Sequence, residues 1–297
     1  MLQKKYTLLF LLLFIAICPL FLAGQKKSRD LKSNEIKTTP KLVVGIVVDQ
    51  MRYDYLTRFW NHYEEGGFKR LVNEGFNCKN NHFNYAPTST GPGHTSVYTG
   101  TTPARHGVIG NNWYDKVNDV EVYCASDPAY ESVGTTTDAG KMSPHRMNVT
   151  TITDELRLHT QMRSKTIAIA LKDRGAVLPG GHTANAAYWF HGRDEGVWVS
   201  STFYMNTLPK WVADFNGSET AASYLKVWNT FYDIETYTES GSDENTFEGG
   251  FKGKEKATFP YDLAELKAKN KGFDILKATL YGNSLTTDFA MAAIKGE

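Results

Sequence analysis

An unbroken apolar run, Leu42 to Asp49 (LVVGIVVD), most constrains how this chain folds, because it is rich in β-branched residues and ends on a carboxylate. A run that is apolar at every position predicts a parallel strand buried on both faces. In α/β sheets, ligands and metal ions gather at the carboxyl ends of such strands. The run therefore predicts an α/β fold with a functional site beside Asp49.

A second motif lies about forty residues further on, where Pro87 to Gly100 reads PTSTGPGHTSVYTG. Thr90 fits the N-cap position of a helix, and Pro92 is tolerated in the first helical turn. A helix start presents free N–H groups and the positive end of the helix dipole to an anion. A hydroxyl is a poor nucleophile near neutral pH unless a metal or a base activates it. Asp49 and Thr90 together therefore predict metal-assisted attack on an anion.

The other polar residues around Thr90 suit structural roles. Ser89 precedes the expected helix, and Thr95 and Ser96 fall a turn or more inside it, so none has the exposed first position. His94 and His106 are predicted to be packed or hydrogen-bonded histidines, not general bases.

The bulk composition excludes several classes of protein. The chain has 297 residues, 41% of them hydrophobic and 13% aromatic, which suffices for one large α/β domain or for one domain with an insertion. Its formal net charge of +1 gives no electrostatic footprint for nucleic acid or for an anionic membrane surface. A substrate anion would have to be held by a few placed cations.

The first 24 residues have the layout of a secretory signal peptide: Lys4 and Lys5, an apolar stretch from Leu8 to Leu22, then Ala23 and Gly24. The stretch is shorter than the roughly 20 residues of a spanning helix, which makes an uncleaved anchor the weaker alternative. A polar linker at 25–40 follows. We expect a bacterial protein exported to the periplasm or secreted, without stable membrane association after cleavage.

The folded domain is expected at 41–297. Helical spacing predicts one helix that ends near Gly75 and another at 151–162 with an apolar face, and 165–171 (KTIAIAL) is a second strand candidate. A helix followed by an apolar strand favours a doubly wound, mostly parallel sheet.

Beyond Gly181 the composition changes to aromatic residues interleaved with turn residues. This pattern predicts an inserted cap at about 181–283, made of a hairpin, short helices and a polar, glycine-rich loop at 241–256. Cys78 and Cys124 are the cysteines left after signal cleavage. The sequence leaves open whether they form a disulfide.

Four segments in order, VVDQMRYDYL, PTSTGPGHTSVYTG, TPARHGVIGNNWYD and LKDRG, resemble the alkaline phosphatase superfamily. More narrowly, they resemble the bacterial periplasmic phosphate-irrepressible phosphatases, whose nucleophile is threonine. The resemblance implies that Asp49 is a zinc ligand and that Thr90 both binds metal and attacks phosphorus. It also implies that Asn111 contacts a phosphoryl oxygen.

Lys172 and Arg174 match the pair that grips the transferred phosphoryl group in these relatives. The physics agrees, because a phosphate monoester is a dianion and two extra cations favour it over a singly charged diester. The alternative is that LKDR is a solvated strand end.

The resemblance implies two Zn²⁺ ions, but the chain supplies recognisable ligands for only one. The last histidine is His191, no aspartate stands four residues before any histidine, and no Asp-His pair occurs. Catalytic zinc usually has three protein ligands. We therefore expect an N-terminal part of a longer enzyme, with the fold incomplete at its C-terminus.

Three hypotheses follow. The first is a secreted zinc-dependent alkaline phosphatase that hydrolyses small-molecule phosphate monoesters through a phosphothreonine intermediate. The second is a phosphodiesterase or nucleotide pyrophosphatase of the same superfamily, and the third is an inactive, truncated chain. The oligomeric state and the physiological ester stay open.

Overall fold

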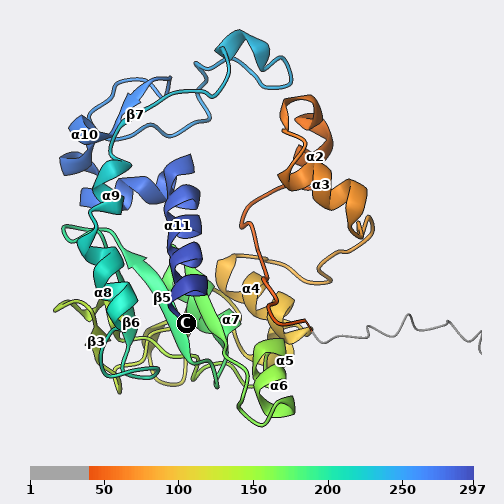
Figure 1. Ribbon diagram of the computed structural model, residues 1–297, viewed down its shortest axis with the longest axis vertical. Coiled ribbons are helices and arrows are strands. Elements are labelled where there is room, and N and C mark those ends of the chain that lie inside the picture. The colour runs from red at the N-terminus through yellow and green to blue at the C-terminus, as the bar shows by residue number, and fades with distance from the viewer. Residues whose placement is uncertain (1–39) are drawn as a thin grey trace, which may run out of the picture. The chain divides into compact units, whose positions relative to one another are not determined.

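The computed structural model describes residues 40–297 (Figure 1). The predicted signal peptide (1–24) and all of the predicted linker except Pro40 lie outside the described residues. The chain divides into two units, Met1–Val47 and Val48–Glu297.

The described part of the first unit, residues 40–47, contains no helix or strand. The prediction of a buried strand over Leu42–Asp49 is therefore wrong for this structure. The side chains of Val43 and Ile46 are 75% and 80% exposed. A strand is held in place by hydrogen bonds to a neighbouring strand, and no strand of residues 40–297 pairs with this run. Without such a neighbour its apolar side chains stay in water.

The main sheet of the second unit has four strands in the order β3 (Ser132–Val133), β6 (Val197–Ser201), β5 (Ala186–His191), β4 (Ile167–Ala170). The β4–β5 pair is parallel, whereas the β5–β6 and β6–β3 pairs are antiparallel. The predicted α/β class is confirmed, and the sheet is mixed. The predominance of parallel pairs that the sequence predicted is not present in residues 40–297, because a short turn joins β5 directly to β6.

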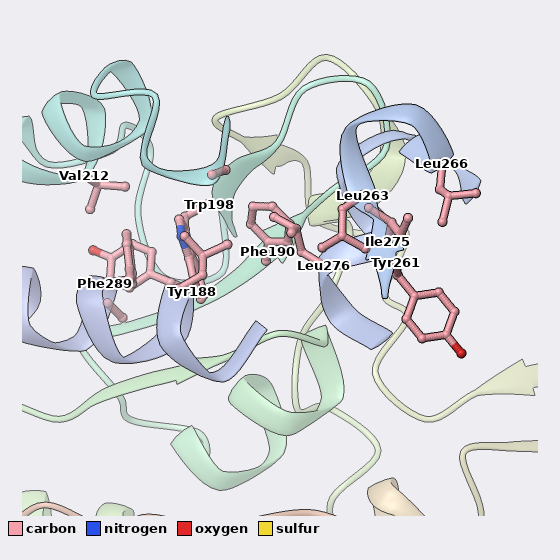
Figure 2. Packing of buried hydrophobic residues seen from close by; sticks show 13 residues of the cluster. Tyr188, Phe190, Trp198, Val212, Tyr261, Leu263, Leu266, Ile275, Leu276 and Phe289 are labelled. Atoms are coloured by element: carbon pink, nitrogen blue, oxygen red, sulfur yellow. The ribbon is translucent and has the colours of Figure 1, made fainter. Parts of the chain in front are cut away.

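Helices cover both faces of this sheet, as in a doubly wound fold. Along β5, Tyr188 and Phe190 point into one cluster with side chains of α8 (Lys210–Gly217) and α11 (Leu280–Gly296) (Figure 2). The alternate residues Ala187 and Trp189 belong to a second cluster with α7 (Asp173–Gly180). Figure 1 shows α8 and α11 on the opposite side of the strands from α7. This alternation is why β5 is buried at every position.

Two of the predicted helices are present. The helix α3 (Gly67–Glu74) ends at Gly75 as expected. The helix α6 is shorter than predicted, spanning Ile152–His159 after Thr151 as its N-cap. Its expected apolar face lies open, with Ile152 68% exposed. The helix is anchored instead by its N-terminus, where Thr151 and Asp154 form a reciprocal capping box.

The segment predicted as an inserted cap, about 181–283, contains two strands of the main sheet, β5 and β6. Because β5 and β6 belong to the main sheet, an insertion cannot begin near residue 181. Past α8 the chain forms short elements: α9 (Thr220–Ser223), β7 (Val227–Trp228), η3 (Ile234–Thr236), β8 (Tyr261–Asp262), α10 (Leu263–Leu266), η4 (Lys267–Asn270) and η5 (Gly272–Ala278). The strands β7 and β8 pair antiparallel.

The other elements of residues 48–166 are short: α2 (Tyr55–Arg58), η1 (Trp60–His62), α4 (Thr90–Thr99), α5 (Pro103–His106), β1 (Asn112–Asp115), β2 (Val120–Tyr123) and η2 (Asp138–Gly140). The strands β1 and β2 form a hairpin. Cys78 is exposed and Cys124 is buried, and both are free thiols. No helix within residues 40–297 is both long and apolar enough to cross a membrane.

Candidate active site

The helix α4 begins at Thr90. The N-cap is Ser89, whose backbone is extended (φ −62°, ψ 166°), so the prediction of Thr90 as N-cap is wrong by one residue. The N-cap is the last residue with non-helical dihedrals, and the chain turns into the helix only after Ser89. The Thr90 hydroxyl still lies at the helix start.

The Thr90 hydroxyl is hydrogen-bonded to Asp49. Thr90 Oγ1 donates to Asp49 Oδ2 at 2.7 Å, across a separation of 41 residues. Asp49 is exposed and Thr90 is half-buried. The Asp49 carboxylate accepts this hydrogen bond and so holds the Thr90 hydroxyl in one direction.

Asn111 meets the same helix start one residue further along. The Gly91 N–H donates to Asn111 Oδ1 at 2.7 Å, which uses one of the unpaired N–H groups of α4. The acceptor role fixes the orientation of the amide, and its Nδ2 group makes no hydrogen bond with residues 40–297. That N–H₂ group is therefore available to donate to a ligand beside Thr90.

The two neighbouring histidines are both engaged in structural contacts. His94 Nδ1 lies 2.9 Å from the carbonyl oxygen of Thr90. His106 is fully buried, with Nε2 2.9 Å from Ser96 Oγ, and its Nδ1 accepts the Val108 N–H at 3.2 Å. Burial lowers the pKa of His106 from 6.5 to about 4, so the ring is neutral near pH 7.

Lys172 and Arg174 lie at the carboxyl end of β4. Lys172 is the N-cap residue of α7, and Arg174 lies in the first turn of that helix. Both line a cavity of about 290 Å³, together with Trp189 and His191 of β5. Lys172 is exposed and has no ion-pair partner among residues 40–297. Its charge is free to meet an anion.

Arg174 is held by residues that the sequence did not single out. Its Nη1 donates to Tyr123 Oη at 2.9 Å, and Tyr123 in turn donates to Asp173 Oδ1. Burial raises the pKa of Tyr123 well above its usual value, and the charge of Asp173 raises it further. Arg174 Nε is buried without a hydrogen-bond partner in the part of the chain that the structure describes. The guanidinium is therefore fixed on one side and keeps an unused donor.

Cys124 lies near both the start of α4 and the side chains of Asp173 and Arg174. A Cβ atom built on Gly91 would approach Cys124 Sγ to 3.2 Å, so the thiol packs against the start of α4. Burial raises the pKa of Cys124 to about 12, and the charge of Asp173 adds to this effect. Hydrogen bonds thus join Thr90 to Asp49 and the adjacent Gly91 to Asn111, while Lys172 and Arg174 lie at the start of α7, where Arg174 contacts Tyr123.

The residues present fit a zinc ion in kind but not in number. The Asp49 carboxylate and the Thr90 hydroxyl both offer oxygen ligands, whereas catalytic zinc takes three protein ligands. No cluster of three or more His, Cys, Asp or Glu side chains that could hold a metal occurs within residues 40–297. No catalytic step through zinc can be derived from these residues alone.

The α/β fold thus carries a carboxylate and a hydroxyl at the start of α4, and two cations at the carboxyl end of β4. The sequence model of the family described as type I phosphodiesterase / nucleotide pyrophosphatase matches residues 43–269. The chain belongs to this family. The resemblance to the alkaline phosphatase superfamily is thereby confirmed.

Three relatives can be compared with the chain. Alkaline phosphatase PhoV of Synechococcus elongatus is 47% identical over 293 residues, which cover 96% of this chain and 53% of PhoV. A protein of Myroides odoratus named calcium-transporting ATPase is 49% identical over 259 residues, 87% of this chain and 47% of that protein. Alkaline phosphatase PafA of Elizabethkingia meningoseptica is 47% identical over 260 residues, 86% of this chain and 47% of PafA. The chain spans about half the length of these relatives.

Crystal structures of PafA share the fold. The wild-type structure matches with a TM-score of 0.84 and 46% identity, over 87% of this chain and 50% of PafA. A second structure, with a TM-score of 0.81, matches at 44% identity over 84% of this chain and 48% of PafA. That structure is of a PafA variant in which a threonine, an asparagine, a lysine and an arginine are replaced.

Proposed function

We propose that the protein is a secreted, zinc-dependent alkaline phosphatase that hydrolyses phosphate monoesters through a phosphothreonine intermediate. The observation that carries the proposal is the Thr90 hydroxyl at the first position of α4, held 2.7 Å from the Asp49 carboxylate. This arrangement combines a fixed nucleophile with an acceptor for its proton and with the anion-favouring end of a helix.

In the proposed reaction Thr90 Oγ1 attacks phosphorus as its proton leaves. A bond forms between Thr90 Oγ1 and phosphorus, and the bond from phosphorus to the ester oxygen breaks, so the alcohol departs after taking up a proton. Water then attacks the phosphothreonine, releases inorganic phosphate and restores the hydroxyl. Positioning and charge stabilisation supply most of the catalysis in transfers of this kind.

The remaining site residues would stabilise the phosphoryl oxygens. Asn111 Nδ2 is free to donate a hydrogen bond, and Lys172 and Arg174 provide two positive charges. A monoester carries one negative charge more than a diester, so these two cations favour monoesters. Zinc, when bound at Asp49 and Thr90, would favour loss of the hydroxyl proton, and it would need at least one protein ligand beyond these two.

The PafA variant supports this assignment of residues. Its four replaced residues follow one another in the same order and at nearly the same spacing as Thr90, Asn111, Lys172 and Arg174. The probability that four residue types agree at three spacings by chance is small.

The test is transfer of labelled phosphate to the protein expressed from its full coding sequence. Incubation with a ³²P-labelled monoester, followed by an acid quench, should trap labelled wild-type protein. Thr90→Ala should trap none and should lose turnover. Ser89→Ala is the matched control, because the neighbouring Ser89 hydroxyl makes no capping hydrogen bond. This variant should retain both the phosphate label and turnover. Labelled Thr90→Ala protein would overturn the assignment.

A phosphodiesterase or nucleotide pyrophosphatase is the second candidate, because the matching family carries that description. It would share Asp49, Thr90 and Asn111 but would not need two extra cations. Measuring kcat/KM for a monoester and for a diester in Lys172→Ala and Arg174→Ala separates the two. A selective loss of monoester hydrolysis favours the phosphatase, whereas equal losses favour the second candidate.

The third reading, an inactive chain, is tested on the 297-residue form itself. Calorimetric titration with Zn²⁺ should show no tight binding of two ions, because residues 40–297 offer only two clustered ligands. Two-zinc binding with turnover would refute the proposed shortage of ligands.

Export is tested by N-terminal sequencing of periplasmic protein, which should begin near residue 25.

A further inference from the structure

A second cavity lies among the short elements between α8 and α11, and it shares Lys277 with the cavity lined by Lys172 and Arg174. Its volume is about 620 Å³, and its walls come from β7, the loop before β8, β8 itself and η5. Pockets of this size hold small organic molecules. No role in the proposed phosphoryl chemistry has been given to it.

One wall of this cavity is aromatic. Trp228 and Tyr261 stack at 5.4 Å with an interplanar angle of 29°, and Phe259 meets both rings edge-on at 5.1 and 5.3 Å. Phe251 packs edge-on against Tyr261 at 5.3 Å. Trp228, Phe251 and Phe259 are only partly buried, so ring surface faces the cavity. In Figure 2 Tyr261 points away from the centre of the core cluster. Such a wall favours a planar ring.

The rest of the lining is polar. Glu248 and Lys271 are exposed, and Asp274 and Lys277 are partly buried. The charge of Glu248 contributes to a raised pKa of Tyr261, after burial and Asp243, so the carboxylate lies near that ring. A planar ring with hydrogen-bonding groups on its edge would find both apolar surface and polar partners here.

Lys277 is the link between the two cavities, because its side chain lines both. Its Nζ lies 2.8 Å from Asp274 Oδ1 and 5.7 Å from the ring centre of Phe190. The ion pair fixes the lysine and balances its charge, so it forms a shared wall rather than a third free cation. A ligand that bridges the cavities would pass Lys277.

We propose that the aromatic cavity is the subsite for the alcohol part of the substrate, and that it favours monoesters whose alcohol carries a planar heteroaromatic ring. The phosphate would lie at Lys172 and Arg174 and the ring at Trp228 and Phe259. The substrate assignment rests on the proposed phosphatase function, whereas the ring-binding site does not.

Adenosine 5′-monophosphate and ribose 5-phosphate test the proposal, because they differ only in the base. For the protein expressed from its full coding sequence, kcat/KM for the nucleotide should exceed that for the sugar phosphate. Trp228→Leu and Phe259→Leu keep an apolar side chain but remove the ring, and each should reduce the ratio about tenfold. Phe247→Leu is the matched control, since this phenylalanine lies in the same loop, is 96% exposed and does not line the cavity. An unchanged ratio in both cavity variants would overturn the proposal.

Equilibrium dialysis with labelled adenosine separates this proposal from the proposed function, because adenosine has no phosphate. Binding to the wild type that weakens in Trp228→Leu supports the ring site even if no monoester is hydrolysed, in which case the phosphatase function alone fails. Hydrolysis of both esters at equal rates, without adenosine binding, would remove the subsite and leave the phosphatase function standing.

Discussion

Arg174 Nη1 donates a hydrogen bond to Tyr123 Oη at 2.9 Å, which joins residues 51 positions apart. The Tyr123 hydroxyl in turn donates a hydrogen bond to Asp173 Oδ1, and Asp173 directly precedes Arg174 in the sequence. The guanidinium also lies beside the Tyr123 ring, 5.8 Å from its centre. Tyr123 therefore fixes where the cation points.

Tyr123→Phe should lower kcat/KM for monoesters at least about tenfold. A hydrogen bond to a charged group contributes roughly 1.5–3 kcal/mol, and a tenfold change in rate corresponds to about 1.4 kcal/mol. Diester hydrolysis should change less, since it depends less on Arg174. Tyr114→Phe on the neighbouring strand β1 is the control, because Tyr114 is exposed and its hydroxyl has no hydrogen-bond partner but Asp119 within residues 40–297.

A double-mutant cycle shows whether Tyr123 acts through Arg174. In an Arg174→Ala background, Tyr123→Phe should have almost no further effect on monoester turnover. Full additivity of the two losses would mean that Tyr123 acts independently, and the positioning role would be wrong.

Gly91→Ala should reduce activity while preserving the fold. A Cβ atom at Gly91 would lie 3.1 Å from Gly110 O, 3.2 Å from Asn111 Oδ1 and 3.2 Å from Cys124 Sγ. These contacts are tight, so the asparagine must shift away from Thr90. We expect a loss of about tenfold in kcat/KM and a destabilisation of about 1–3 kcal/mol.

Gly66→Ala provides the control for the glycine change, because nothing lies within 4 Å of a Cβ atom there. Circular dichroism and urea unfolding report the fold, and steady-state kinetics report the site. Gly91→Ala with wild-type kcat/KM would show that Asn111 does not need its observed position.

Sequence patterns predicted the elements whose stability is local or whose residues alternate regularly. Helix α3 with Gly75 and the strand β4 both follow from spacing and end signals. The apolar run at 42–48 failed, because burial of a strand depends on its neighbours in the sheet and not on its own composition. Aromatic residues interleaved with turn residues predicted that the β5–β6 hairpin belongs to a cap. In the structure, the side chains of this hairpin alternate between two hydrophobic clusters, one on each face of the main sheet.

The site was partly accessible to sequence reasoning. Thr90 and Asp49 carried the expected acid and hydroxyl, and their hydrogen bond places them together. Tyr123 could not be found, because its contact with Arg174 depends on the register of the β1–β2 hairpin.

His106 should make the protein less stable as the pH falls below neutrality. Burial lowers its pKa from 6.5 to about 4, so between these values the unfolded chain binds a proton that the folded chain does not. The contribution is fully present above pH 6.5 and is lost as the pH falls toward 4, by up to about 3 kcal/mol.

NMR titration of the histidine ring protons measures this directly, and one residue should titrate near pH 4. Assignment uses His106→Gln, whose spectrum should lack that resonance. His82→Gln serves as the control, because His82 is exposed and its ring hydrogen-bonds only to Asn80 among the residues that the structure describes. A titration of His106 near 6.5 would contradict the buried, neutral ring.

Asp154 should stabilise the fold through its ionised form, because its buried carboxylate collects donors from two segments. Oδ2 accepts the Thr151 N–H at 3.0 Å, and Oδ1 accepts the Thr183 N–H at 2.7 Å and the Thr183 hydroxyl at 2.8 Å. Burial alone would raise the pKa of Asp154, but these hydrogen bonds outweigh it and hold the pKa below its usual 3.8. The stabilisation is therefore present above about pH 4 and is lost as the pH falls through the lowered pKa.

Asp154→Asn keeps the size of the side chain but removes its charge, so one amide N–H₂ group must face an N–H donor. Urea unfolding at pH 7 should show a loss of about 2–3 kcal/mol, and the difference from the wild type should shrink near pH 3. Asp214→Asn is the matched control, because that aspartate is exposed in α8 and its one ion-pair partner in the described part of the chain is Lys210, so the change should cost less than about 0.5 kcal/mol. Equal losses for both variants at pH 7 would show that the link between α6 and Thr183 does not stabilise the fold.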